Sequence, residues 1–159
     1  MDKREFIDRV KSERQLWDEL LSQVPDDQML TPGVEGDWSA KDILAHLMWY
    51  EREMIGVLKA RALVGSDWWA LPLEERNAAV HGEVSGMSLE EVRAEVACVF
   101  PALVEQLELL PEEALHDAAH FEGMPAEWAP SDVIGSNTFR HYPDHTESIR
   151  RLIGLDTDS

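Results

Sequence analysis

The sequence is dominated by long stretches in which apolar residues recur every three or four positions. This spacing places them on one face of an α-helix and does not fit the two-residue period of a half-buried strand. The stretches lie at residues 2–24, 40–63, 73–84, 88–110 and 132–153, of which the third is short. No alternating strand pattern of useful length and no internal repeat occurs. The sequence therefore predicts an all-α protein, a four-helix bundle in a single domain spanning residues 1–159.

Serine residues indicate where three of these helices begin. Ser39 and Ser88 each precede an apolar run and are followed three positions later by an acidic residue, Asp42 and Glu91 respectively. A serine side chain in this position accepts a hydrogen bond from the first helical turn, and the acidic residue can return one. We expect Ser131 to cap the last helix in the same way, and Gly154 to end it.

Two prolines lie inside predicted helices. A proline within a helix removes one backbone hydrogen bond and pushes away the preceding carbonyl, which bends or breaks the helix. We expect Pro101 to kink the helix that contains it. Because the helical period continues beyond Pro143, we expect the last helix to bend there rather than end. A break at Tyr142 would be expected to separate the histidines on either side of the proline.

The charge of the chain restricts its partners. The 14 Lys and Arg residues stand against 32 Asp and Glu residues, which gives a net charge of −18. So acidic a surface repels phosphate backbones and anionic lipid, and this argues against nucleic-acid and membrane partners. The single cysteine, Cys98, excludes an internal disulfide and is expected to be an inert core thiol. Without a signal-like or membrane-spanning apolar run, we expect a soluble, cytoplasmic protein.

Three histidines are expected to face the interior of the bundle. His46 lies at the edge of the apolar stripe of the second long helix, and His141 and His145 lie four apart on the stripe of the last one. Burying several imidazoles without partners costs a few kcal/mol each, roughly, whereas one metal ion would satisfy a nitrogen on each of them. Three protein ligands with open coordination positions are typical of catalytic metal sites. The alternative is that these histidines are structural.

The remaining histidines are weaker candidates. His116 and His120 are also four apart, but they lie among acidic residues and glycine in a connection, so we expect them to be exposed. His81 has no partner in the sequence. Tyr50, one turn after His46, and Tyr142 are candidate catalytic proton donors. The alternative, which is the more common role of a buried tyrosine, is that both are core aromatics with a satisfied hydroxyl.

Two motifs, taken together, resemble a known family. The segment "WSAKDILAHLMWYE" is followed about 90 residues later by "NTFRHYPDHTESIRRL". In order and separation these resemble the DinB/YfiT-like metalloprotein superfamily. The middle segments "ERNAAVHGEVSGMSLEEVRAEV" and "LELLPEEAL" are most similar to its ClbS/DfsB branch. The resemblance extends over roughly residues 4–153.

The resemblance implies a bundle wound up-down-down-up, a homodimer, and a divalent metal ion on His46, His141 and His145. Relatives in this superfamily include transferases and isomerases that use low-molecular-weight thiols. The ClbS-like branch includes a self-resistance protein that opens an electrophilic cyclopropane. The resemblance therefore suggests a metal-dependent enzyme, of hydrolase or thiol-transferase type, that acts on a small electrophilic or thiol-conjugated molecule in self-resistance or detoxification.

The residues leave the metal and the function open. Zinc is the first expectation, and nickel, iron and manganese also suit imidazole ligands with water. An ion with open positions can activate water or hold a substrate thiol. A non-catalytic protein that binds or sequesters a small molecule could use the same pocket. A small-molecule ligand is expected in either case.

Overall fold

The computed structural model describes residues 1–155, and within that range it contains helices and connections but no strand. The α-helices are α1 (Lys3–Leu21), α2 (Ala40–Ala60), α3 (Leu73–Val84), α4 (Leu89–Leu109), α5 (Pro130–Ser136) and α6 (Pro143–Leu152). Three short 3-10 helices lie in the connections: η1 (Asp67–Ala70), η2 (Glu112–Leu115) and η3 (Ala118–His120). The all-α prediction is confirmed.

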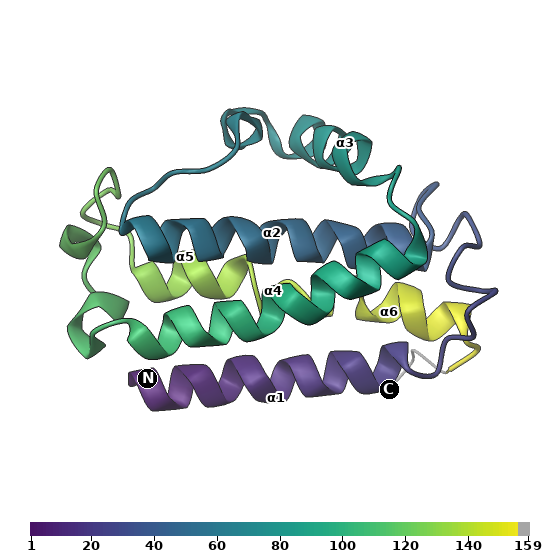
Figure 1. Cartoon of the computed structure of the whole chain (residues 1–159), viewed down its shortest axis with the longest axis horizontal. Helices are drawn as coiled ribbons and strands as arrows, with labels where there is room; N and C mark the ends of the chain where they lie inside the picture. Colours follow the sequence, from purple (N-terminus) through teal and green to yellow (C-terminus); the bar gives the residue numbers. More distant parts are fainter. Residues whose placement is uncertain (156–159) are drawn as a thin grey trace.

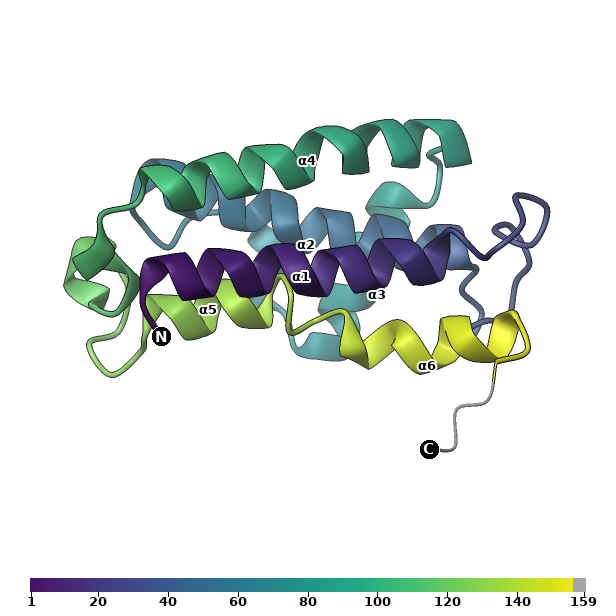
Figure 2. The ribbon, with the colours of Figure 1, turned by 90° about the horizontal axis from the view of Figure 1, so that it is seen from below.

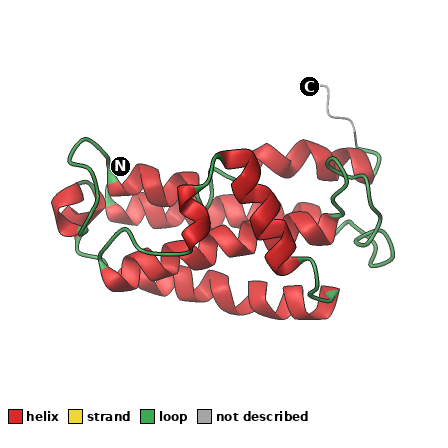
Figure 3. Ribbon diagram, turned by 90° about the horizontal axis from the view of Figure 1, so that it is seen from above, coloured by secondary structure: helices red, strands yellow, loops and turns green. Residues whose placement is uncertain are grey.

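The bundle consists of α1, α2, α4 and the consecutive pair α5 and α6 (Figure 1). Helix α1 and the α5–α6 pair run in one direction, and α2 and α4 run in the other, so the winding is up-down-down-up. Because α2 and α4 are parallel, the chain must return along the bundle between them. Helix α3 lies on that return path and packs across α2 (Figure 3).

Polar residues fix the starts of the long helices. Asp2 and Ser39 each form a reciprocal capping box, with Glu5 and Asp42 respectively, and Ser88 Oγ accepts a hydrogen bond from the Glu91 amide. The predicted starts at Ser39 and Ser88 are therefore confirmed, because these residues satisfy amides that the first helical turn leaves unpaired. The predicted cap at Ser131 is wrong. Helix α5 begins at Pro130, two residues before the predicted start at Asp132, and its cap residue Ala129 makes no side-chain capping bond.

The last long helix is interrupted rather than bent. Helix α5 ends at Ser136, α6 begins at Pro143, and residues 137–142 form turns between them (Figure 2). Pro143 is the first residue of α6, where the absence of an amide hydrogen costs nothing because that position has no intrahelical acceptor. By contrast, α4 is continuous through Pro101. The expectation of one helix bent at Pro143 is wrong.

The core surrounds α2, which packs mainly against α4 and is also covered by α3. Among its fully buried side chains are Ile43, Met48, Trp49 and Leu58. Cys98 is exposed, so the expectation of a core thiol is wrong: the helical period of α4 buries its neighbour Val99 instead. Among residues 1–155, none of the helices combines the length and the apolar character needed to cross a membrane.

Candidate metal centre

The three histidines predicted as metal ligands lie together. Nε2 of His141 is 3.3 Å from Nε2 of His46 and 3.3 Å from Nε2 of His145. The three ligand atoms all lie within 4.8 Å of one another, and His46 and His145 are buried. Tetrahedral zinc with Zn–N bonds of about 2.0–2.1 Å holds its nitrogen ligands roughly 3.3–3.4 Å apart. The three residues are therefore positioned to bind one metal ion.

The break in the last helix does not separate His141 from His145. Tyr142 has φ −58° and ψ −45°, which are helical values, although it precedes α6. The amide of His145 donates to the Tyr142 carbonyl at 3.0 Å, and the amide of Asp144 donates to the His141 carbonyl at 3.3 Å. One helical turn thus continues through Pro143 and places both imidazoles on the same side. The expectation that a break at Tyr142 would disperse the site is wrong.

Burial keeps two of the imidazoles neutral. Removal from water, together with the other histidines nearby, lowers the pKa of His46 from 6.5 to about 3. Removal from water and the neighbouring His145 lower the pKa of His141 to about 4. Neutral imidazole has a lone pair for a metal ion, so this environment prepares both side chains as ligands at neutral pH.

The outer nitrogen of one histidine is held by an acidic residue that the sequence did not reveal. Nδ1 of His145 lies 2.6 Å from Oε2 of Glu35, in the loop before α2. An ionised carboxylate can only accept, so Nδ1 carries the proton, and Nε2 then presents its lone pair to the centre of the triad. The corresponding Nδ1 atoms of His46 and His141 are buried and have no hydrogen-bond partner among residues 1–155.

Aromatic rings enclose the triad on two sides. The ring of Trp38 lies 5.0 Å from that of His46 and stacks on His81 at 5.1 Å. The ring of Tyr50 lies 5.0 Å from both His46 and His141. His81 therefore stands behind Trp38 rather than among the three ligands. These rings limit the access of water to the histidines.

The Tyr50 hydroxyl is anchored beside the triad. It donates to Oδ1 of Asn77, on α3, at 2.7 Å. Burial raises the pKa of Tyr50, and the nearby Arg76 guanidinium opposes that rise. Tyr50 is therefore a neutral phenol whose ring lies against His46 and His141 and whose proton is donated to Asn77. Asn77 and Arg76 come from a short helix whose segment carries part of the family resemblance, but its residue spacing assigns neither of them to the site.

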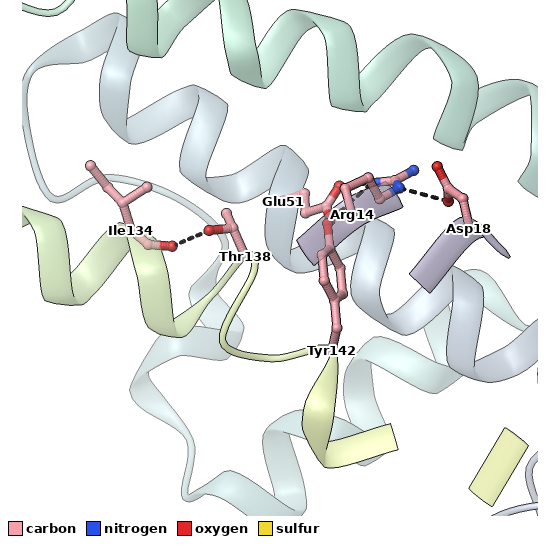
Figure 4. Close-up of polar contacts among 6 residues, drawn as sticks. All are labelled: Arg14, Asp18, Glu51, Ile134, Thr138 and Tyr142. Carbon is pink, nitrogen blue, oxygen red and sulfur yellow. Dashed lines mark hydrogen bonds and ion pairs between the residues drawn. The ribbon is translucent and has the colours of Figure 1, made fainter. Parts of the chain in front are cut away.

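The Tyr142 hydroxyl points into a separate buried cluster, the Arg14–Glu51–Tyr142 cluster (Figure 4). It donates to Glu51 and lies 3.2 Å from Nη1 of Arg14, which also contacts both Glu51 oxygens at 3.2–3.3 Å. The Tyr142 ring stacks on Trp17 at 5.8 Å. The structure therefore does not bring Tyr142 to the histidine triad, although it is the neighbour of His141 in the chain.

The charges of this cluster depend on one another. Burial raises the pKa of Glu51, and the charge of Arg14 opposes that rise. Burial and the Glu51 charge raise the pKa of Tyr142 well above its usual value. Burial alone would lower the pKa of Arg14, but Glu51 and Tyr142 outweigh it and raise that pKa. Arg14 thus carries the positive charge of a buried ion pair.

The other pair of histidines with helical spacing has a different environment. His116 and His120 are exposed, as predicted. A ring nitrogen of His116 lies 2.7 Å from the Met1 carbonyl oxygen, and His120 lies near Asp117. Spacing of four is therefore not sufficient to identify a ligand pair, and burial on converging elements distinguishes the two cases.

A cleft of about 1280 Å³ adjoins the triad without including it. Met54, one turn after Tyr50, and Asn137, four residues before His141, line it. The ring of Trp69, another wall residue, lies 5.5 Å from that of Tyr50. Glu53 holds this wall in place by accepting from Trp69 Nε1 at 2.8 Å. Tyr50 therefore stands between the cleft and the histidines.

Comparison with known proteins bears on the family and the fold of this chain. Residues 9–149 match the family described as the DinB superfamily. The solved structure named "Sibling Lethal Factor Precursor - DfsB" superposes with a TM-score of 0.78 over 95% of this chain and 94% of that chain, at 17% sequence identity. At that identity the likeness shows a shared fold. No curated protein matches the sequence. With most of its length matching the family and its fold shared with DfsB, the chain belongs to the DinB superfamily.

Proposed function

We propose that this protein is a metal-dependent enzyme that acts on a small electrophilic or thiol-conjugated molecule. The observation that carries the proposal is the convergence of three imidazole Nε2 atoms at the spacing that one divalent ion requires. A set of three histidines leaves coordination positions for substrate, as in catalytic rather than structural sites. Zinc suits this set best, and nickel, iron and manganese are also compatible with it.

The residues around the triad have separate tasks in this proposal. His46, His141 and His145 would hold the ion, and Glu35 would orient His145 through its Nδ1 proton. A divalent ion at this position supplies a Lewis acid with open coordination positions. Trp38 would limit the entry of water, and Tyr50, whose phenol is neutral, would donate a proton to a leaving group. We do not retain Tyr142 in this role, because its hydroxyl lies in the Arg14–Glu51–Tyr142 cluster and not at the triad.

A second candidate function is non-catalytic binding or sequestering of a small molecule. The cleft beside the triad favours it, because a pocket of this size can enclose a drug-sized ligand whether or not a reaction follows. As implied by the resemblance, we also propose a cytoplasmic homodimer for either function. Sedimentation velocity would test the dimer.

Turnover distinguishes the two functions. We would incubate the metal-loaded protein with epoxides, cyclopropanes and thiol conjugates, with and without a low-molecular-weight thiol, and follow products by mass spectrometry. An enzyme should convert at least one class, and only when metal is present. The Tyr50→Phe variant should lower the rate by about 10²–10⁴-fold without loss of metal. Binding without conversion by the loaded protein would support sequestering instead, and unchanged turnover in Tyr50→Phe would remove Tyr50 as the acid.

A further inference from the structure

Arg76 is a half-buried cation whose contacts are all with neutral groups. Its guanidinium lies 3.4 Å from the Trp68 carbonyl oxygen, 3.3 Å from that of Trp69 and 3.2 Å from that of Leu71. It also lies over the Trp69 ring, 4.9 Å from the centroid. Within residues 1–155, no carboxylate forms an ion pair with it. Other arginines do have carboxylate partners: Arg9, Arg14, Arg52, Arg93 and Arg140.

The position of Arg76 connects the cleft to the triad. Arg76 lines the cleft and lies over the Trp69 ring, which is 5.5 Å from the ring of Tyr50. Tyr50 in turn contacts His46 and His141. A group bound to Arg76 would therefore lie at the part of the cleft wall formed by Trp69, which is the wall nearest to Tyr50. In a chain with a net charge of −18, this is a cation on the wall of a pocket.

The rest of the cleft suits an apolar body. Met54, Val57 and Val133 form part of its wall, together with the rings of Trp69 and Trp128. The acidic residues that also line it are Asp67, Glu127 and Asp132. All three are exposed to solvent, which screens their charges, and Asp132 is paired with Arg140 at 3.0 Å.

We propose that the cleft is the substrate pocket, and that Arg76 selects a small organic anion, a carboxylate or sulfonate attached to an aromatic or other apolar body. The Nε and Nη2 hydrogens of Arg76 already point to the carbonyls of Trp68, Trp69 and Leu71. The two hydrogens on Nη1 remain to donate to either anion, in charge-assisted hydrogen bonds, while the guanidinium keeps its stacking contact with Trp69. The apolar body then lies against the two tryptophans. The inference rests on the proposed function, because it names the substrate class of the same site.

Two fluorescent probes of nearly equal shape test the charge preference. Anilinonaphthalene sulfonate carries an anion, and N-phenylnaphthylamine is its neutral counterpart. The native protein should bind the sulfonate more tightly. Arg76→Met should weaken sulfonate binding by about tenfold or more and leave the neutral probe almost unchanged. Arg52→Met removes the same charge from an exposed arginine outside the cleft, and it should leave both affinities unchanged.

A second variant establishes where the probes bind. Ser136 is an exposed residue on the cleft wall, and Ser136→Trp should obstruct both probes while circular dichroism and metal content stay native. Unchanged binding in Ser136→Trp, or equal loss of both probes in Arg76→Met, would overturn the proposal. In the latter case Arg76 only supports the turn of Trp68 and Trp69. Metal content is measured on the same samples. If the native protein prefers the sulfonate probe but contains no metal, the result would refute the metal centre and still support the anion pocket.

Discussion

His46 and His141 are held as neutral imidazoles by burial, and this has a consequence for the metal-free protein. In an ordinary imidazole with a pKa of 6.5, protons compete with a metal ion for the ring nitrogen just below neutral pH. In the folded chain the pKa of His46 is lowered to about 3 and that of His141 to about 4. Both ligands therefore stay available to a metal ion under mildly acidic conditions.

The same shifts predict how the stability of the metal-free protein depends on pH. Between pH 6.5 and pH 4 the unfolded chain takes up protons on these two histidines and the folded chain does not. The contribution of these two histidines to the free energy of unfolding should therefore have its full value above pH 6.5 and decrease as the pH is lowered. Urea denaturation across this range should show that the free energy of unfolding falls less steeply with decreasing pH in His46→Leu. The slope should correspond to about one fewer proton taken up on unfolding. An identical slope in the variant would contradict the buried, neutral state of His46.

Glu35 acts on the site through a single hydrogen bond to His145. Removing it by Glu35→Ala should weaken metal affinity by about 10–100-fold, because the ring loses its orientation and some basicity. Asp37→Ala is the matched control, since Asp37 is exposed in the same loop and carries the same charge. Competition titration with a chromogenic chelator measures both variants. Equal affinity in the two would show that Glu35 contributes only its charge.

At the scale of elements, the Arg14–Glu51–Tyr142 cluster joins α1 and α2 to the turn that precedes α6. The segment at residues 137–142 forms turns with backbone hydrogen bonds such as that from the Arg140 amide to the Gly135 carbonyl, and side-chain contacts add to these. The cluster and the stacking of Tyr142 on Trp17 provide these side-chain contacts. We infer that the cluster positions His141 by holding its chain neighbour Tyr142, although the side chains of the cluster do not contact the three ligands.

Breaking this cluster should be costly. Arg14→Met leaves the buried carboxylate of Glu51 without its cation and should lower the free energy of unfolding by about 3–5 kcal/mol. Arg9→Met removes an exposed ion pair with Glu13 on the same helix and should change it by less than about 1 kcal/mol. Adding Glu51→Gln to Arg14→Met should recover part of the loss. Equal, small effects of both single variants in denaturant titrations would contradict a tightly coupled buried pair.

The elements also show which features a single sequence can predict. Helical periodicity and the caps at Ser39 and Ser88 are local signals, and they predicted where α2 and α4 begin. Pro143 was misread because a proline fits both a bent helix and the first position of a new one, and local spacing does not choose between them. Glu35 and Arg76 reach the site region from a loop and a connecting helix. Their roles depend on tertiary packing and have no signature in the spacing of residues.

For the whole molecule, the winding explains why one site can draw on distant parts of the chain. Placing α2 beside the α5–α6 pair brings His46 next to residues almost 100 positions later, with His46 and His141 separated by 95 in sequence. The return path of α3 places Asn77 beside Tyr50 and Arg76 in the wall of the adjoining cleft. The bundle thus encloses the triad and leaves the cleft open along one side of it.

The central claim is that His46, His141 and His145 together hold one divalent ion. We would measure metal content by inductively coupled plasma mass spectrometry on protein purified without an affinity tag. The native chain should carry about one ion per chain, and His46→Ala and His145→Ala should each lose it, because two histidines with water bind far more weakly. His116→Ala and His120→Ala, at exposed positions with the same spacing, should retain it. Absence of metal after incubation with zinc, nickel and manganese, or full occupancy in His46→Ala, would contradict the account and make the histidines structural.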